Sequence, residues 1–302
     1  MAKTGHIIGT HPVDNGGIDM AVRRAAGAGM VAVQIFTAIP KFYGDKSSIS
    51  DKRVVRFQKA LADTGMKPQN VMVHGAYVLN AATEDPEKWS RTAAALTKEM
   101  ERSTTLGVGQ VCFHPGACPR VDGPKAGAER VAKAMAQALA AVDGPTRLLV
   151  ENSAGAGTTF GKNAEEVGLI LAALPKELGG RAGYGLDTCH LFVSGYDLKA
   201  SKDSFTRVLD EFEEATGEPP AFFHLNDSVG ALGSNRDRHC LIGEGELGEA
   251  PFGWLLADRR SRGIPLILET PQVNADVADD DPTGDPYDVR MMDVLRKLGA
   301  EI

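Results

Sequence analysis

The sequence, 302 residues long, lacks the features that mark several classes of protein. It has no apolar run of about 18 residues or more, so we expect no transmembrane helix. Residues 1–17 contain no hydrophobic segment followed by a small-residue cleavage site, so we expect no secretory signal. The four cysteines form no CxxC pair and no disulfide framework, a usage typical of a reducing compartment. Together these absences predict a cytoplasmic protein that does not bind a membrane.

Positive charge is scarce, and the formal net charge is −7. A negative total argues against a polyanionic partner such as nucleic acid. Bound cations, however, are often the largest local charges in a site. Three divalent ions would bring the formal charge from −7 to −1, so the charge alone does not exclude DNA.

No GxGxxG motif follows the first apolar run, which argues against a doubly wound dinucleotide-binding sheet. No internal repeat, low-complexity tract or glycine-rich linker divides the chain, so we expect a single domain over residues 1–302. The acidic segment 275–285 is predicted to be an exposed loop before the last helix.

The chain does contain a regular succession of short apolar runs. Eight of them end in polar or glycine-containing turns, at 6–11, 31–36, 70–75, 110–116, 147–152, 183–188, 221–226 and 265–270. Most run ends are 36 to 45 residues apart, which leaves room for one strand, one helix and two loops. Helical spacing of apolar residues is found between the runs, at 19–28, 86–106, 128–142 and 164–174. Eight alternating units predict an α/β fold, a (β/α)8 TIM barrel.

Imidazole and carboxylate side chains recur at the ends of these runs. The third to the eighth run end at or beside His74, His114, Glu151, Asp187, His224 and Glu269. Three further candidates follow in turns and loops, namely His190, Asp237 and His239. In a TIM barrel, functional residues come from the C-terminal ends of several strands, which meet on one face. A lone histidine there is usually structural, but clustered unpaired carboxylates are costly without cations.

The sequence therefore predicts a metal centre with nine ligands and an active site at the C-terminal ends of the strands. Nitrogen and oxygen ligands without thiolate fit zinc, with manganese or iron as alternatives. With about four ligands per zinc, nine suit two or three ions. His6 starts the first run and is expected to be structural, whereas His11 ends it near the pocket mouth. Cys189 and Cys240 adjoin ligands, either as soft donors or, more commonly for cysteine, as small buried hydrophobes.

Several segments resemble the endonuclease IV family of zinc-dependent apurinic/apyrimidinic (AP) endonucleases. They are HGAYVLN (74–80), FHPGA (113–117), VENSAGAGTTFG (150–161), LDTCHLFVSGYDL (186–198), HLNDSVGALGSNRDRHCLIGEGELG (224–248) and PLILET (265–270). The resemblance runs in order over nearly the whole chain, and DTCH with the later GSNRDRH and IGEG is its most specific part. It implies a hydrolase that cleaves the phosphodiester 5′ to abasic sites in double-stranded DNA, in base excision repair.

Position by position, the resemblance implies a trinuclear zinc centre with a metal-bridging hydroxide as the nucleophile. The first ion would be held by His74, His114 and Glu151, and Glu151 would bridge to the second ion. The second would also take Asp187, His224 and Glu269, and the third would take His190, Asp237 and His239. Glu151 and Glu269 are the two candidates to orient the hydroxide, and the sequence does not choose between them.

The chain departs from the family mainly where DNA would be read. The turn TAIPKFYG (37–44) carries Lys41, Phe42 and Tyr43, which either wedge into an opened base step or pack as a surface turn. Gly75 and Ala76 replace an acidic or small polar pair that is frequent in the family.

Tyr77, which follows that pair, is either a probe of the abasic gap or a packed aromatic at the rim. Val229 stands where the family has a lysine, while Arg236 and Arg238 flank a third-site ligand as candidate phosphate contacts. The resemblance implies abasic or 3′-blocked duplex DNA as the substrate, and the departures leave the preferred lesion open. The sequence is silent on oligomeric state, and a monomer is the default expectation.

Two rival functions remain at this point. A sugar isomerase or epimerase of the xylose-isomerase type shares the barrel and the strand-end ligands, but its one or two metals do not require His190, Asp237 and His239. A DNA-lesion-binding protein with structural zinc is the second rival. Structural zinc sites are normally closed by four protein ligands each, which the nine candidates do not provide for three ions.

Overall fold

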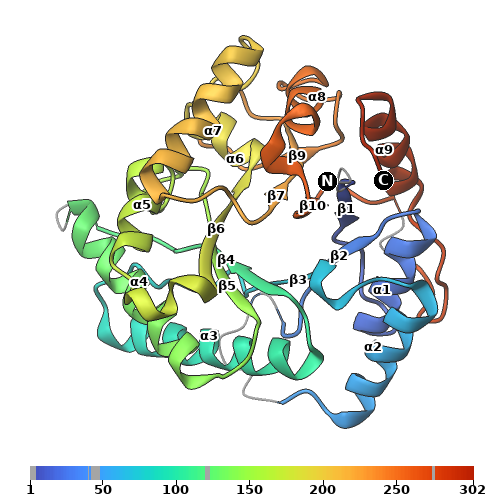
Figure 1. The fold of residues 1–302 in the computed structure, drawn as a ribbon, viewed down its shortest axis with the longest axis horizontal. Coiled ribbons are helices and arrows are strands. Elements are labelled where there is room, and N and C mark those ends of the chain that lie inside the picture. The colour runs from blue at the N-terminus through green and yellow to red at the C-terminus, as the bar shows by residue number, and fades with distance from the viewer. Residues whose placement is uncertain (1–4, 40, 42–47, 120–122, 274–275) are drawn as a thin grey trace.

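The computed structural model describes residues 5–39, 41, 48–119, 123–273 and 276–302. Its centre is a closed barrel of eight parallel strands in the order β1-β10-β7-β6-β5-β4-β3-β2 (Figure 1). The strands are β1 (Ile7–Thr10), β2 (Ala32–Ile35), β3 (Val71–His74), β4 (Gln110–Phe113), β5 (Arg147–Glu151), β6 (Ala182–Asp187), β7 (Phe223–His224) and β10 (Pro265–Leu268). Each predicted apolar run overlaps one of them, so the predicted (β/α)8 TIM barrel is confirmed.

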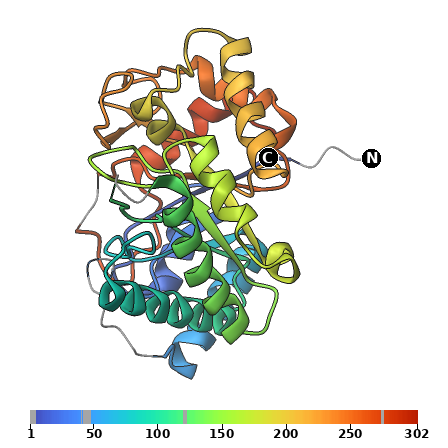
Figure 2. The same cartoon turned by 90° about the vertical axis from the view of Figure 1, so that its left-hand side faces the viewer.

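Helices lie outside the strands and surround them (Figures 1 and 2). They are α1 (Ile18–Gly27), α2 (Asp51–Thr64), α3 (Pro86–Leu106), α4 (Gly123–Ala141), α5 (Ala164–Ala172), α6 (Thr188–Ser194), α7 (Lys202–Thr216), α8 (Ala250–Ala257) and α9 (Pro286–Lys297). The helix predicted at 86–106 is confirmed at both ends, because Asp85 caps its first N–H groups and Gly107 ends it in a left-handed conformation. The predicted start of α4 at 128 is five residues too late, because its first turn, GPKAG, has no large apolar residue to show the helical period.

Residues 276–285 form turns and irregular segments before α9, which confirms the predicted loop over its described part. Among the described residues, no helix combines the length and the hydropathy that a membrane crossing requires.

The strands bring the ligand candidates to one level. All four residues of β2, β3, β4 and β10 are buried, because the barrel interior covers one face and the helices cover the other. Between neighbouring strands, Glu151 pairs with Gly185 and Asp187 pairs with His224. Since parallel strands all point the same way, their C-terminal ends form a single face.

Below this face, the barrel interior is filled by apolar side chains. The interior cluster consists of Ala32, Met72, Cys112, Leu149, Ala221, Phe222 and Ile267. The Phe222 ring is fully buried, and its centroid lies 4.8 Å from that of His224, so it forms part of the floor of the site. A Cβ atom on Gly185 would overlap the Phe222 ring, and position 185 therefore has no room for a side chain.

We predict that Gly185→Ala lowers the free energy of unfolding by about 1–3 kcal/mol, because overpacking forces the Phe222 ring or the backbone to shift. Urea denaturation measures this change. Gly179→Ala is the matched control, since a Cβ at that exposed position meets nothing within 4 Å. Equal stability of the two variants would contradict the packing argument.

Candidate metal centre

The nine predicted ligands lie together at the C-terminal end of the barrel. Each belongs to at least one group of three or four residues whose potential ligand atoms all lie within 4.8 Å of one another. The strands and the residues directly after them supply six: His74, His114, Glu151, Asp187, His224 and Glu269. Helix α6 supplies His190, and the hairpin of β8 (Asp227–Ser228) and β9 (His239–Cys240) supplies Asp237 and His239.

Glu151 is at the centre of this cluster and has no exposed surface. Its Oε2 lies 3.2 Å from Nε2 of His74 and 3.8 Å from Nε2 of His114. Its Oε1 lies 2.9 Å from Nδ1 of His224 and 3.3 Å from Nδ1 of His190. The two carboxylate oxygens thus face different histidines, an arrangement that suits a carboxylate bridging two ions.

The spacing of the other ligand atoms suits zinc. Two ligand atoms at 2.0–2.2 Å from a tetrahedral zinc ion are about 3.3–3.6 Å apart. Nδ1 of His224 lies 3.4 Å from Oε2 of Glu269, and Nε2 of His190 lies 3.3 Å from Oδ2 of Asp237. Nε2 of His239 lies 3.1 Å from the other oxygen of Asp237. The donor set could hold such ions with only small movements of these side chains.

The hydrogen bonds of the histidines favour metal binding as well. Nδ1 of His74 lies 2.7 Å from the carbonyl oxygen of Gly75, and Nδ1 of His190 lies 2.9 Å from that of Asn152. A carbonyl oxygen only accepts, so each Nδ1 donates, and in the neutral ring each Nε2 has a lone pair that faces a carboxylate. Lone pairs that face carboxylate oxygens repel them unless a proton or a metal ion lies between.

Burial and the neighbouring charges shift the pKa values of individual histidines in opposite directions. Burial lowers the pKa of His114 to about 4, so this ring is neutral at neutral pH and suited to metal binding. Burial also lowers the pKa of His239, but the charge of Asp187 and the hydrogen bond with Asp237 outweigh it and raise that pKa to about 9. A metal ion binds only the neutral ring and therefore competes with this proton.

Three buried polar residues that the sequence analysis missed hold the ligands in place. Gln34 on β2 donates to Oε1 of Glu269 over 2.5 Å, and Asn226 donates to Oδ2 of Asp187 over 2.6 Å. Asn226 also accepts from the backbone N–H of Glu269, and Asn152 accepts from that of Asp187. The signal for each was a single amide residue inside or directly after an apolar run, in VAVQIF, VEN and HLN.

The loop that carries Asp237 and His239 is fixed by two more residues that were not predicted. Asp227 is fully buried and accepts from the backbone N–H groups of Gly243, Gly245, Leu247 and Gly248. Asn235 adopts a left-handed φ of 55° and donates from Nδ2 to the carbonyl oxygen of Ala154 over 2.9 Å. Asn235 thus ties the loop between β8 and β9 to the loop after β5, and Asp227 ties β8 to the segment after β9.

Of the predicted DNA-reading residues, Tyr77 packs against the ring of His74, and Arg236 and Arg238 flank Asp237. Tyr77 is 52% exposed, and its ring contacts that of Phe36 with centroids 5.4 Å apart. Lys41, Arg236 and Arg238 are exposed. Phe42 and Tyr43 lie outside the described residues, so their role stays a prediction.

The remaining histidines and cysteines divide between core and site. His6 lies away from the cluster, where its ring bonds the backbone of Leu256 and Glu301, as expected for a structural histidine. His11 lies at the site, with its Nδ1 atom 3.8 Å from Oε1 of Glu269. Cys189 is fully buried as expected, but Cys240 is only partly buried, because the two-residue strand β9 lies at the surface.

Two cavities open beside the ligands and share Tyr77 as a wall. One, of about 340 Å³, is lined by residues that include His11, His239 and Glu269. The other, of about 410 Å³, is lined by residues that include His114 and Asp237. Tyr77 therefore stands between two spaces that both reach the candidate ligands.

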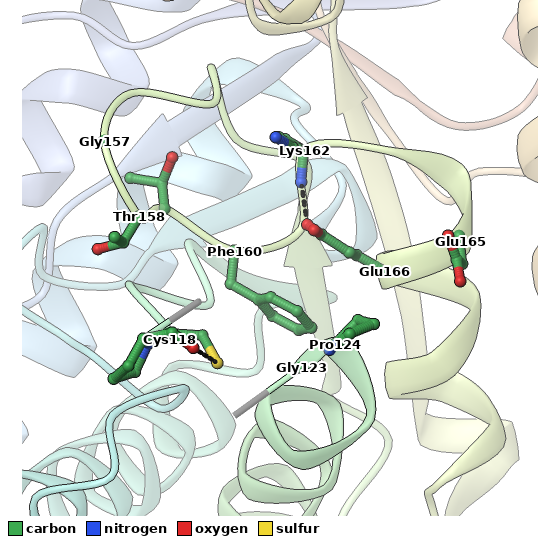
Figure 3. Close-up of a pocket in the computed structure, with 11 residues that line it drawn as sticks. Cys118, Gly123, Pro124, Gly157, Thr158, Phe160, Lys162, Glu165 and Glu166 are labelled. Carbon is green, nitrogen blue, oxygen red and sulfur yellow. Dashed lines mark hydrogen bonds between the residues drawn. The ribbon is translucent and has the colours of Figure 1, made fainter. Parts of the chain in front are cut away.

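A third cavity, of about 200 Å³, lies between the loops after β4 and β5, and none of the nine candidate ligands lines it (Figure 3). Cys118, Phe160 and Lys162 are among the residues that line it. Glu166 accepts hydrogen bonds from the backbone N–H groups of Gly161 and Lys162, so its carboxylate already has partners.

Comparison with known proteins supports the barrel fold and places the chain in a family. Residues 22–297 match the family model described as xylose isomerase-like TIM barrel. A probable endonuclease 4 from Geobacter sp. is 36% identical over 275 residues, which cover 90% of this chain and 95% of that protein. A probable endonuclease 4 from Chloroflexus aggregans is 35% identical over 274 residues, covering 90% and 93%.

Solved structures show the same relationship. Endonuclease IV from Thermus thermophilus has a TM-score of 0.78 and 31% identity, over 96% of this chain and 98% of that chain. A D-allulose 3-epimerase from Methylomonas sp., with a TM-score of 0.63 and 16% identity over 99% and 100% of the chains, shares the fold alone. The chain therefore belongs to the endonuclease IV family of the xylose isomerase-like TIM barrels.

Proposed function

We propose that the protein is an AP endonuclease that hydrolyses the phosphodiester 5′ to abasic sites in double-stranded DNA and leaves a 3′-hydroxyl. The observation that carries the proposal is the convergence of all nine ligand candidates around Glu151. The relatives named endonuclease 4 add support. The proposal includes three zinc ions, with Mn²⁺ or Fe²⁺ as alternatives, and 3′-blocked ends as further substrates.

Bound zinc ions would supply a nucleophile near neutral pH and would stabilise charge on the phosphate oxygens. The chain's own contribution is to hold and orient the reacting groups. Both oxygens of Glu151 are engaged by histidines, and its side chain has no exposed surface. The Glu269 side chain is 12% exposed and lines the cavity beside Tyr77. Glu269 is therefore better placed than Glu151 to orient the attacking water and to accept its proton.

DNA would lie across the exposed rim of this face. Tyr77, between the two cavities, would enter the gap that a missing base leaves in the stack. Arg236 and Arg238 would contact phosphate oxygens next to Asp237. Val229, which is 55% exposed, supplies an apolar surface where the resemblance predicts a lysine. The protein would therefore make fewer contacts with the DNA phosphates there.

The two rival functions are less consistent with this site. A sugar epimerase does not require Asp237 and His239, which the hairpin and Asn235 hold beside Asp187 and His190. A protein with structural zinc would close each site with four ligands, whereas two open cavities adjoin this cluster.

The direct test uses a duplex oligonucleotide with one tetrahydrofuran abasic analogue. We expect the zinc-loaded protein to cut 5′ to the analogue and leave an end that a DNA polymerase extends. A strong chelator should abolish the cut, and the same duplex without the analogue should stay intact. Uncut DNA under all conditions, or turnover of a ketose instead, would overturn the proposal.

Glu269→Gln tests the assignment of the base. We expect kcat to fall by about 100-fold or more, because the amide cannot accept a proton, while binding of the abasic duplex remains measurable. Zinc per chain is measured alongside, because Glu269 is also a candidate ligand. Glu87→Gln, on the exposed surface of α3, is the control and should keep full activity. Near wild-type turnover of Glu269→Gln would exclude the role.

A further inference from the structure

Gln34 is a polar side chain inside the barrel. It lies on β2 between Val33 and Ile35, and all three residues are buried. A primary amide without hydrogen-bond partners in such a place would be costly to bury. Its contacts therefore show why a glutamine is found in the middle of an apolar strand.

Every polar atom of the Gln34 amide has a partner at the site. Its Oε1 lies 2.8 Å from Nε2 of His224, and Sγ of Cys112 donates to the same oxygen over 3.6 Å. Its Nε2 donates to Oε1 of Glu269 over 2.5 Å and lies 3.0 Å from Nδ1 of His11. The opposite amide orientation would place the amide oxygen against the Glu269 carboxylate, so the contacts fix a single orientation.

This orientation determines which nitrogen of His224 is free. Because Oε1 of Gln34 only accepts, Nε2 of His224 must carry the proton that is donated to it. In the neutral ring, Nδ1 of His224 then has the lone pair, and it lies 2.9 Å from Oε1 of Glu151 and 3.4 Å from Oε2 of Glu269. The histidine is thus held in the tautomer that can bind a metal ion shared with these carboxylates.

The same amide also fixes Glu269. One carboxylate oxygen, Oε1, is held by the amide N–H of Gln34, whereas Oε2 faces His224 and lies 3.5 Å from Nδ2 of Asn226. Oε2 is therefore the oxygen that is left for an ion or for the attacking water. One side chain from β2 controls two candidate ligands, from β7 and from the residue after β10.

We propose that Gln34 is a positioning residue that fixes the His224 tautomer and the Glu269 carboxylate, and so sets the metal affinity of the position formed by Asp187, His224 and Glu269. The other two metal positions, which include His114 or Asp237, do not contact Gln34, and their metal affinity should stay unchanged. The proposal rests on the ligand assignment within the proposed function, but its test does not require DNA cleavage.

Gln34→Met separates positioning from packing, because methionine has a similar volume and makes no such hydrogen bonds. Zinc release is measured by competition with a chelator of known zinc affinity. We expect one zinc ion per chain to bind 10- to 100-fold more weakly than in the wild type. The other ions should be released as in the wild type. With abasic DNA, kcat should fall while KM stays unchanged.

Gln110→Met is the matched control. Gln110 is buried at the start of β4, and its Nε2 has no hydrogen-bond partner in the described residues. This variant should release all its zinc as the wild type does. The double variant Gln34→Met with Glu269→Gln should lose hardly more zinc affinity than either single variant, because both act on the same ion.

Unchanged release of every ion from Gln34→Met would overturn the proposal, as would an equal weakening of all ions, which is the result expected from a packing defect. A wild-type chain that binds no zinc would overturn it together with the ligand assignment. A chain that binds zinc and loses one ion in Gln34→Met, yet does not cut DNA, would refute the nuclease function and leave the role of Gln34 standing.

Discussion

Three carboxylates, the buried Glu151 and Asp187 and the largely buried Glu269, face histidines within a few ångströms of one another. The rest of the site depends on how their charge is compensated. Burial of an ionised carboxylate costs several kcal/mol unless a partner or a cation restores its solvation. Protons on the histidines or metal ions between the ligands can provide that compensation. The nitrogen and oxygen donors, which lie 3.1 to 3.4 Å apart at His190, Asp237, His239, His224 and Glu269, have the spacing that zinc ions between them would need.

The barrel strands and the loops each supply part of this site. Parallel strands place six ligands at one level without any contact between distant loops, since their C-terminal ends meet on one face. Buried amides then orient those ligands, as Gln34 does for His224 and Glu269. The last two ligands come from a hairpin loop, which Asp227 and Asn235 tie down through backbone groups. Orientation of ligands by such outer contacts is typical of metal sites.

Much of this architecture was predictable from the sequence, for identifiable reasons. Strand ends were visible because a buried parallel strand is a continuous apolar run, and α3 was visible because it has an N-cap, an apolar period and a C-terminal glycine. The grouping of ligands around individual ions rested on the resemblance, since spacing along the chain does not show which strands face one another. Gln34 was missed because one amide in an apolar strand looks like a surface position. The hairpin of β8 and β9 was missed because two-residue strands show no alternation. The rim residues Phe42 and Tyr43 stay predictions.

X-ray diffraction above and below the zinc absorption edge, on crystals of the zinc-loaded protein, tests the central claim most directly. The account predicts three anomalous peaks within the cluster, with Glu151 in contact with two of them and His239 with a third. A single peak, or zinc bound away from these nine residues, would contradict the account. It would mean that protons, not metal ions, compensate the buried carboxylates.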